Sequence, residues 1–180
     1  DGQSLAEHRA ECAPVLGKTI YLVPTGPFDA DATTVLTRLG PLLAAHFQLR
    51  VKLLPALPAS IAGKRERKRD FGKQWLTKDI LDGLLDVRPA DAAAVMAVTT
   101  VDLYPDPAWN FVFGEATHAE RVGVMSLFRT GDLHAEPALV LTRTYATGMH
   151  EIGHMLQLYH CVAWECPMNG SNHQEEADSR

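Results

Sequence analysis

The chain has 180 residues, a length that suits one domain with its own hydrophobic core and no need of disulfide staples. Hydrophobic residues make up 46% and charged residues 22%, as in ordinary globular proteins, and no apolar run reaches the roughly eighteen residues of a membrane span. The net charge of −5 argues against nucleic acid as the main partner. We therefore expect neither a membrane nor a nucleic-acid partner.

The first half of the chain shows the alternation of strands and helices that is typical of α/β proteins. Apolar and β-branched runs bounded by Pro and Gly predict buried strands, and apolar residues at helical spacing predict a helix between them. Pro41 falls inside that helical pattern, where a kink is expected. The predicted order is a strand at 18–24, a helix at 31–47 and a strand at 49–54.

The second half continues this alternation and ends in a tail rich in loops. A continuous run of small and β-branched residues gives the strongest strand pattern of the chain, and two shorter runs after it predict a strand pair. The predicted elements are a helix at 74–85, a strand at 92–103, strands at 109–114 and 121–129, and a helix at 143–156.

This order predicts an α/β protein, tending to α+β, with a mixed sheet. The early crossovers favour parallel pairing, whereas the later strand pair favours an antiparallel edge. The turn at 24–27 lacks the glycines and the lysine of a phosphate-binding loop, which disfavours a nucleotide-binding fold. We expect a single domain over residues 1–180, with sheet and helices to about residue 156 and a smaller subdomain from 157 to 180.

The basic run at residues 64–69, KRERKR, has two interpretations. It resembles a nucleic-acid patch, in which case neutralising it should abolish partner binding. The run has no interleaved aromatic residues and the chain has no basic excess, so a solvated surface loop is the interpretation that we favour.

The chemistry of the chain is concentrated in His150, Glu151 and His154, which form an HExxH motif. Two histidines four residues apart lie on one face of a helix, where both imidazoles can bind one zinc ion. Glu151 is then placed to take a proton from a zinc-bound water, as a general base. A chance match to this motif is expected about once in fifty chains of this composition.

His160 is the candidate for a third ligand, and three protein ligands leave one position for water. It lies too far round a continuing helix, so it can join the pair only if the helix stops and the chain turns back. Gln157 stands where such a turn requires a left-handed backbone, a conformation that costs a residue with a side chain about 1–2 kcal/mol.

With Cys161, Cys166 and Met168 included, the segment resembles the archaemetzincin family of zinc metallopeptidases. The family pattern is HExxHxxGxxHC, four residues, Cys, one residue, Met and later CxxC, and Gln157 departs from it at the glycine. The segments 102–104 and 110–116 are also similar to family sequences, so the resemblance spans roughly residues 18–180.

The resemblance implies a metzincin-like fold, a twisted mixed sheet with an active-site helix and a loop-rich C-terminal subdomain. It implies that His150, His154 and His160 bind a catalytic zinc and that Glu151 is the general base. It also implies that Met168 forms the hydrophobic floor of the zinc site, the Met-turn.

The resemblance also implies that Cys161 and Cys166 are two of four ligands of a second, structural zinc. The chain ends at Arg180 before any CxxC, so we expect that the remaining ligands lie in a missing tail. The alternatives are a pair of buried thiols or a disulfide. An odd cysteine count without a spread-out framework favours a reducing, cytoplasmic compartment, although a leader removed before Asp1 stays possible.

The expected activity is hydrolysis of a peptide or protein substrate by a monomer. The predicted strand pair at 109–129 would offer the sheet edge along which an extended peptide pairs. The alternative is a zinc-binding scaffold that binds peptides or proteins without cleaving them, and Gln157 is the feature that keeps this alternative open.

Overall fold

The computed structural model describes residues 2–15 and 17–180 of the chain. Its largest sheet has five strands in the order β2-β1-β5-β8-β7. All neighbours in it are parallel except β7 and β8, which are antiparallel. The strands are β1 Thr19–Thr25, β2 Arg50–Leu53, β5 Ala92–Thr99, β7 Gly114–Ala116 and β8 Val122–Ser126.

A second sheet of three strands lies beside the first and has the order β3-β4-β6. Its strands are β3 Glu66–Arg69, β4 Gly72–Leu76 and β6 Asp102–Tyr104. The helices are α1 Leu5–Glu11, α2 Ala30–Phe47, α3 Ala59–Ala62, α4 Thr77–Val87, α5 Pro137–Met155 and α6 Gln174–Asp178.

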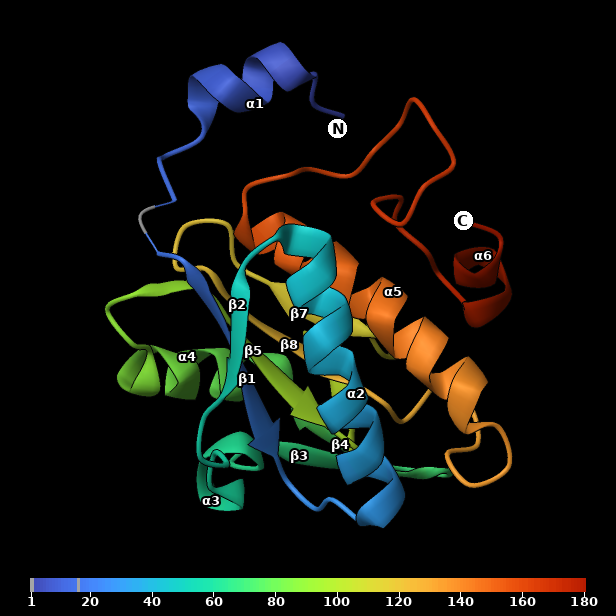
Figure 1. The fold of residues 1–180 in the computed structure, drawn as a ribbon. Helices are drawn as coiled ribbons and strands as arrows, with labels where there is room; N and C mark the ends of the chain where they lie inside the picture. Colours follow the sequence, from blue (N-terminus) through green and yellow to red (C-terminus); the bar gives the residue numbers. More distant parts are fainter. Residues whose placement is uncertain (1, 16) are drawn as a thin grey trace.

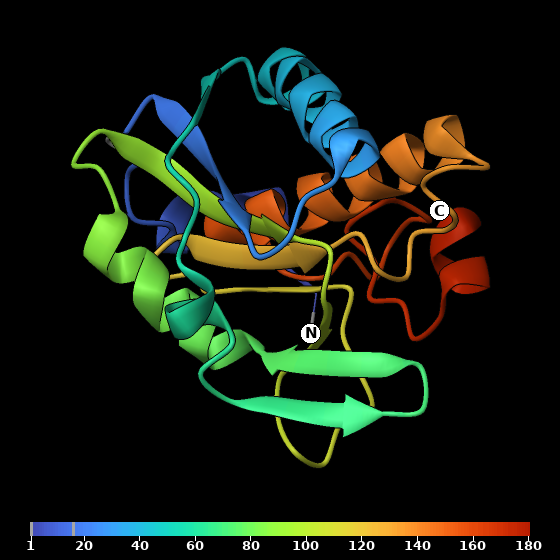
Figure 2. The same ribbon diagram turned by 90° about the horizontal axis from the view of Figure 1, so that it is seen from below.

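The five-stranded sheet separates two hydrophobic cores. Helices α2 and α5 cover one face, while α4 and the β3–β4 hairpin lie on the other (Figure 2). Successive residues of a strand point to opposite faces. Ile20 and Leu22 of β1 accordingly pack in the core under α2 and α5, whereas Tyr21 and Val23 pack in the core under α4. This burial on both faces explains why β1 and β5 read as continuous apolar runs.

The predicted mixed α/β sheet is therefore present, with parallel strands first and an antiparallel strand at one end of the order. The short helices α3 and α6 were not predicted, and neither was α1. Its sequence carries a capping box, in which the Ser4 side chain accepts from the Glu7 amide and the Glu7 side chain accepts from the Ser4 amide. Figure 1 shows α1 outside the layers, beyond the end of α5 that carries the HExxH motif.

Two predicted elements in the middle of the chain are wrong in their boundaries. The helix predicted at 74–85 begins at Thr77, because the preceding residues end β4 and pair with β6. The strand predicted at 92–103 is divided, since β5 ends at Thr99 and β6 begins at Asp102 in the other sheet. The Thr99 side chain accepts a hydrogen bond from the Val101 amide at 3.2 Å across this bend. Residues 74–77 are all buried, as are 93–99 and 101–103, so hydrophobicity alone did not mark the breaks.

Three further predictions need correction. The basic run is not a loop, because residues 66–69 form β3 in a hairpin with β4. The strand predicted at 109–114 is irregular apart from a bridge between Val112 and Leu103, and β7 starts at Gly114. The helix predicted from residue 143 begins at Pro137, which occupies the first helical position, where proline is favoured.

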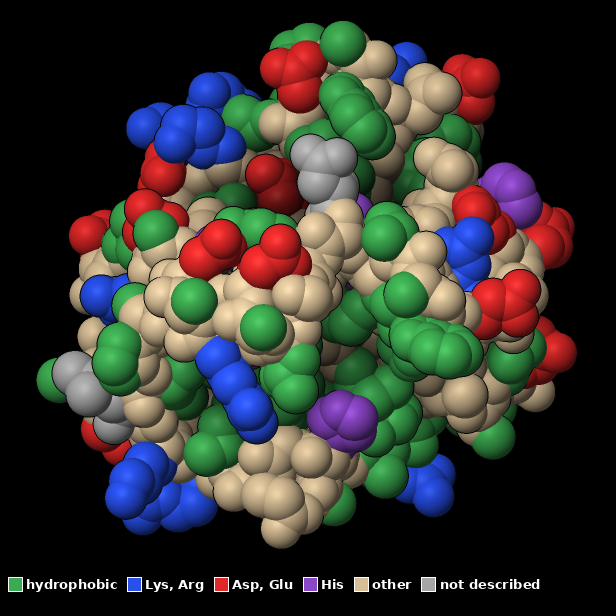
Figure 3. Space-filling model, turned by 90° about the horizontal axis from the view of Figure 1, so that it is seen from above, with side chains coloured by type: hydrophobic (Ala, Val, Ile, Leu, Met, Phe, Trp, Pro, Cys, Tyr) green, Lys and Arg blue, Asp and Glu red, His purple; other side chains and the backbone are tan. Residues whose placement is uncertain are grey.

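The surface seen from the side of α1 mixes the side-chain types. Lys and Arg side chains form separate groups there, between acidic and apolar side chains (Figure 3). Within the described residues, no helix combines the length and the apolar character that crossing a membrane requires.

Candidate metal centre

Helix α5 positions the HExxH motif at its C-terminal end. Val140, Ile152 and Met155 are fully buried against the sheet and α2, so the face of the helix that carries His150 and His154 is turned toward the opposite side. A Cβ atom at Gly148 would lie in ordinary van der Waals contact with Leu43 and Met125, so this part of the helix packs against the core.

Helix α5 ends at Met155, directly after His154. His160 can lie beside the two helical histidines only if the helix ends there. The Leu158 amide donates to the Gly153 carbonyl at 2.9 Å, and the Gln157 amide donates to the His154 carbonyl at 2.8 Å. These two bonds form a Schellman motif, whose reversal needs a left-handed residue. Gln157 is that residue, with a φ of 70°. A side chain in this conformation costs about 1–2 kcal/mol, which the surrounding contacts must offset.

The reversal brings His160 beside the two helical histidines. The ring nitrogens of His150, His154 and His160 lie within 4.8 Å of one another. The Nδ1 atoms of His150 and His154 each lie 2.7 Å from a backbone carbonyl oxygen, of Pro167 and Leu158 respectively. A carbonyl oxygen only accepts, so both Nδ1 atoms carry the proton and both Nε2 atoms present lone pairs.

This arrangement fits a zinc ion. The Nε2 atoms of His150 and His154 are 3.0 Å apart, so two lone pairs face each other with no proton between them. Their repulsion is relieved by a cation between them, and a tetrahedral zinc with bonds of about 2.0–2.1 Å places its nitrogens about 3.3 Å apart. Burial lowers the pKa of His150 and lowers that of His154 to about 4, so both imidazoles are neutral at pH 7, the state that binds metals.

Glu151 lies beside this cluster and is almost completely buried, with 5% of its surface exposed. It lines the same cleft as His150 and His160. Burial, with the nearby charge of Glu115, raises the pKa of Glu151 to about 8. A cation at the three histidines would oppose this shift, because an opposite charge favours the ionised carboxylate. A Cβ atom at Gly114 would lie 2.6 Å from Glu151 Oε1, so β7 leaves room for this carboxylate only with glycine there.

The chain after His160 folds back under α5. Met168 packs against Gly153, where a Cβ atom would lie 2.5 Å from the methionine sulfur, so this thioether lies against the helix between the motif's two histidines. The Cys161 amide donates to the Met168 carbonyl at 2.9 Å, which fixes the return of the chain. Met168 therefore packs against α5 beside the histidines, and its role as the floor of a zinc site stays a prediction.

Cys161 and Cys166 lie in this returning loop, and neither is in a disulfide. Backbone hydrogen bonds from Ala163 and Trp164, together with a side-chain hydrogen bond to Cys166, lower the pKa of the Cys161 thiol. Burial raises the pKa of the Cys166 thiol. The hydrogen bond between the two thiols lowers the pKa of Cys161 and raises that of Cys166. The disulfide alternative is not what the structure has.

A cleft of about 810 Å³ leads to the histidines. One wall is the segment 109–114, which precedes and starts β7, and α5 lies below it. The other wall is the C-terminal tail, in which Arg143 of α5 binds Asp178 of α6 through two hydrogen bonds of 2.9 and 2.5 Å. This volume falls within the range of about 300–1,000 Å³ that is typical of ligand pockets.

Arg67, from the basic run, holds the first wall from outside. Its guanidinium donates to the carbonyl oxygens of Pro107, Trp109 and Asn110 at 3.2, 2.6 and 2.9 Å. It also lies 4.0 Å above the Tyr104 ring. Arg67 is therefore a structural part of the cleft wall.

Arg129 holds the same wall from the other side. It makes two hydrogen bonds of 2.8 and 2.7 Å to Asp102, whose side chain is fully buried, and its guanidinium lies 3.7 Å from the centre of the Phe111 ring. Gln74 joins the two arginines, since it accepts from Arg67 and donates to Asp102. The segment 107–111 is thus fixed by one connected network.

We expect Arg67→Ala to lower the free energy of unfolding by about 1–3 kcal/mol, because three carbonyl oxygens and Gln74 lose a charged donor. Urea denaturation measures this change. The matched control is Lys68→Ala, an exposed residue of the same strand whose removal should change stability by less than about 0.5 kcal/mol. Equal effects of the two variants would contradict a structural role of Arg67.

Sequence reasoning singled out the three histidines, and the structure brings them together. Sequence reasoning did not identify Gly114, Arg67 or His118. The centre of the His118 ring lies 5.4 Å from that of the His154 ring. Their signals were weak: Gly114 belongs to the segment 110–116 that resembles the family, and Arg67 was hidden within a run of similar charges.

Comparisons with known proteins show similarity to one peptidase family. The model of peptidase family M54 matches residues 48–180. Archaemetzincin-2 from Homo sapiens is 35% identical over 168 residues, covering 76% of this chain and 47% of that protein. Archaemetzincin from Pyrococcus furiosus is 34% identical over 159 residues, covering 85% of this chain and 81% of that protein.

The fold agrees as well. The crystal structure of archaemetzincin from Methanopyrus kandleri superposes with a TM-score of 0.71 and 28% sequence identity, covering 91% of this chain and 87% of that one. The chain spans about half the length of the mammalian relative that it matches and most of the length of the archaeal ones. The family match over residues 48–180 and the relation to the Pyrococcus furiosus protein show that this chain belongs to peptidase family M54, the archaemetzincins.

Proposed function

We propose that the chain is a zinc metallopeptidase that hydrolyses peptide bonds in a peptide or protein substrate. The observation that carries the proposal is the convergence of three histidine donors beside the buried carboxyl group of Glu151 in one cleft. Membership of a family of peptidases supports it. The cytoplasmic location and the monomeric state stay predictions.

His150, His154 and His160 would hold the zinc ion, and the hydrogen bonds to the Pro167 and Leu158 carbonyls would keep two of the rings in the binding tautomer. Zinc bound there would supply Lewis-acid chemistry and lower the pKa of a water molecule to about 7.

Glu151 would act as the general base. Its carboxylate would accept a proton from the attacking water and later deliver that proton to the leaving amine nitrogen, so that no covalent intermediate forms. Its burial keeps bulk water away from the carboxylate, and Gly114 holds open the space that the carboxylate occupies.

An extended substrate would lie along β7. This strand stands at the end of the strand order and borders the cleft, so a peptide could add to the sheet as a further strand. The edge expected from the strand pair at 109–129 thus reduces to three residues, Gly114–Ala116.

Cys161 and Cys166 would bind a second, structural zinc. A closed tetrahedral site needs four ligands. The third cysteine of the chain, Cys12, hydrogen-bonds elsewhere, to His8 and Gln157. We therefore propose that these two thiols provide two of the four ligands of such a site.

The test is cleavage of a mixture of peptides, followed by mass spectrometry, with zinc measured by elemental analysis on the same sample. We expect bound zinc, cleavage that stops when a chelator removes the metal, and cleavage that returns with added zinc. Zinc binding and peptide binding without cleavage of any peptide would support the inactive scaffold instead. Absence of bound zinc after reconstitution would contradict both.

A further inference from the structure

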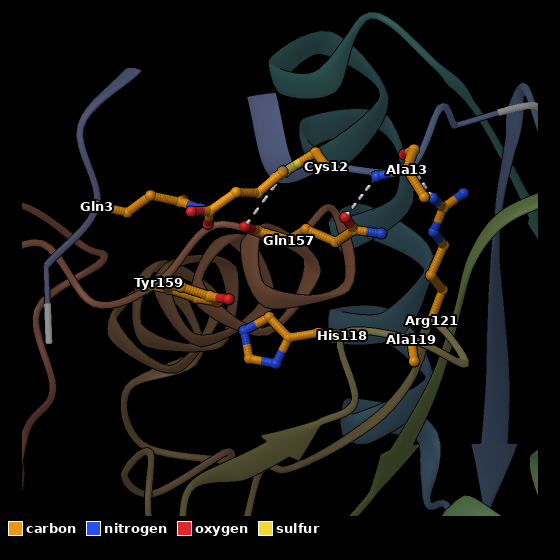
Figure 4. Close-up of a pocket in the computed structure, with 9 residues that line it drawn as sticks. Gln3, Cys12, Ala13, His118, Ala119, Arg121, Gln157 and Tyr159 are labelled. Carbon is orange, nitrogen blue, oxygen red and sulfur yellow. Dashed lines mark hydrogen bonds between the residues drawn. The ribbon is translucent and has the colours of Figure 1, made fainter. Parts of the chain in front are cut away.

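The N-terminal segment, residues 3–14, packs against the turn that delivers His160. It lies beyond the end of α5 (Figure 1), and the close-up in Figure 4 shows Cys12 and Ala13 next to Gln157. The contact joins residues about 145 positions apart in the sequence, and it falls on the residue that departs from the family pattern.

Gln157 contacts this segment through both its side chain and its backbone. The Ala13 amide donates to Gln157 Oε1 at 2.9 Å. The Gln157 carbonyl oxygen lies 3.3 Å from His8 Nδ1 and accepts from the Cys12 thiol at 3.7 Å. His8 and Cys12 also contact each other, with 2.9 Å between Nδ1 and Sγ. A glycine at this position could keep the backbone contacts but would lose the bond to Ala13.

Arg121 is a second anchor for the segment and comes from a different element. Its guanidinium donates to the carbonyl oxygens of Ala13 and Pro14 at 2.9 and 3.3 Å. Ala13 is therefore held at its amide by Gln157 and at its carbonyl by Arg121 (Figure 4).

The segment lies close to the histidines that would bind zinc. It borders a cavity of about 350 Å³ whose other walls include His118 and Tyr159. The His118 ring packs against Tyr159 and against His154, with centroids 5.2 and 5.4 Å apart. Because Gln157 lies between His154 and His160 in the chain, contacts that fix Gln157 also fix the path from one histidine to the other.

We propose that Gln157 is a positioning residue that fastens the N-terminal segment onto the ligand turn, residues 156–160, and that the docked segment slows loss of the metal from this turn. In this proposal, the Gln157 side chain stands in place of the glycine of the family pattern because the side chain binds the Ala13 amide of the N-terminal segment. The proposal rests on the proposed zinc site, but its first measurement does not need the metal.

The first measurement is the alkylation rate of Cys12, followed by mass spectrometry of its peptide in the zinc-free protein. Gln157→Gly and Gln157→Asn tolerate a left-handed backbone but cannot bond to Ala13, since glycine has no side chain and asparagine is one methylene shorter. Loss of one hydrogen bond corresponds to about fivefold faster alkylation. Gln157→Glu keeps an acceptor oxygen at the same reach, so it should restore the slow rate. Equal rates in all four proteins would overturn the proposal.

The second measurement is the rate at which bound zinc passes to a chromophoric chelator, once the unchanged protein has been shown to bind zinc. We expect release about fivefold faster in Gln157→Asn and in Arg121→Ala, which frees the segment without altering the turn. Faster Cys12 alkylation in Arg121→Ala with unchanged zinc release would overturn the coupling. Failure of the unchanged protein to bind zinc would instead refute the proposed function.

Discussion

Glu151→Gln is expected to lower kcat for peptide hydrolysis by about 10²- to 10⁴-fold, the contribution of a positioned general base. The amide has the shape of the carboxylate, so the buried pocket against Gly114 stays filled, but it cannot accept a proton from water. Glu151 is not one of the three histidine donors, so zinc should stay bound. The measurement is steady-state hydrolysis of a peptide found to be cleaved, with zinc per chain determined on the same protein.

The matched control is Glu115→Gln, the carboxyl group whose charge helps to raise the pKa of Glu151. Glu115 accepts a hydrogen bond from Thr77 on the side of α4, so it does not reach the histidines and most activity should remain. Turnover in Glu151→Gln equal to that of the unchanged protein would exclude the general-base role. Loss of zinc together with activity would mean that Glu151 holds the site together rather than moving a proton.

The sheet could be predicted from the sequence because hydrophobic periodicity reports burial. The runs at 18–24 and 92–99 are buried on both faces, and such strands appear as continuous apolar stretches. The same rule failed where burial continued through a change of direction. The Gln74 side chain is buried, and its amide nitrogen donates hydrogen bonds to Asp102 and to the Asn110 carbonyl. Because these partners are distant in sequence, no local pattern could assign Gln74 to β4.

The histidine cluster could be predicted because its chemistry depends on local spacing. His150 and His154 share a helix face, and only the position of His160 depended on a tertiary event, the turn at Gln157. The contacts that surround the cluster could not be predicted in this way. Gly114 approaches Glu151 from a strand 37 positions earlier, a long-range pairing that a single sequence does not encode visibly.

Gln157 stands where the family pattern has glycine, and the fold shows what this difference does to the turn. From sequence, a side chain at a left-handed position counted against His160 as a ligand. In the structure the turn forms with that side chain, and contacts to the N-terminal segment stabilise it. The left-handed backbone expected at Gln157 is therefore present. Whether the turn could form depended on contacts with the N-terminal segment, for which no element was predicted.

His154→Ala is expected to remove the catalytic zinc and with it the hydrolysis of peptides. His154 would be the middle ligand of the three, and its Nε2 atom is 3.0 Å from that of His150, so its loss leaves only two histidine donors of that cluster. Loss of an outer hydrogen-bond partner alone lowers metal affinity by about 10- to 100-fold, and loss of a direct ligand should exceed this. Elemental analysis after dialysis should find one zinc equivalent fewer per chain.

His118→Ala provides the comparison, because His118 packs against His154 but is not among the residues whose donor atoms converge. It should keep its zinc, since only the packing of its ring against His154 and Tyr159 is lost. If both variants lose zinc equally, general disruption around α5 explains the result and the assignment of His154 as a ligand fails. If neither loses it, the metal lies elsewhere in the chain. Loss confined to His154→Ala, with the far-ultraviolet circular dichroism unchanged, separates binding from folding and ties the metal to this helix.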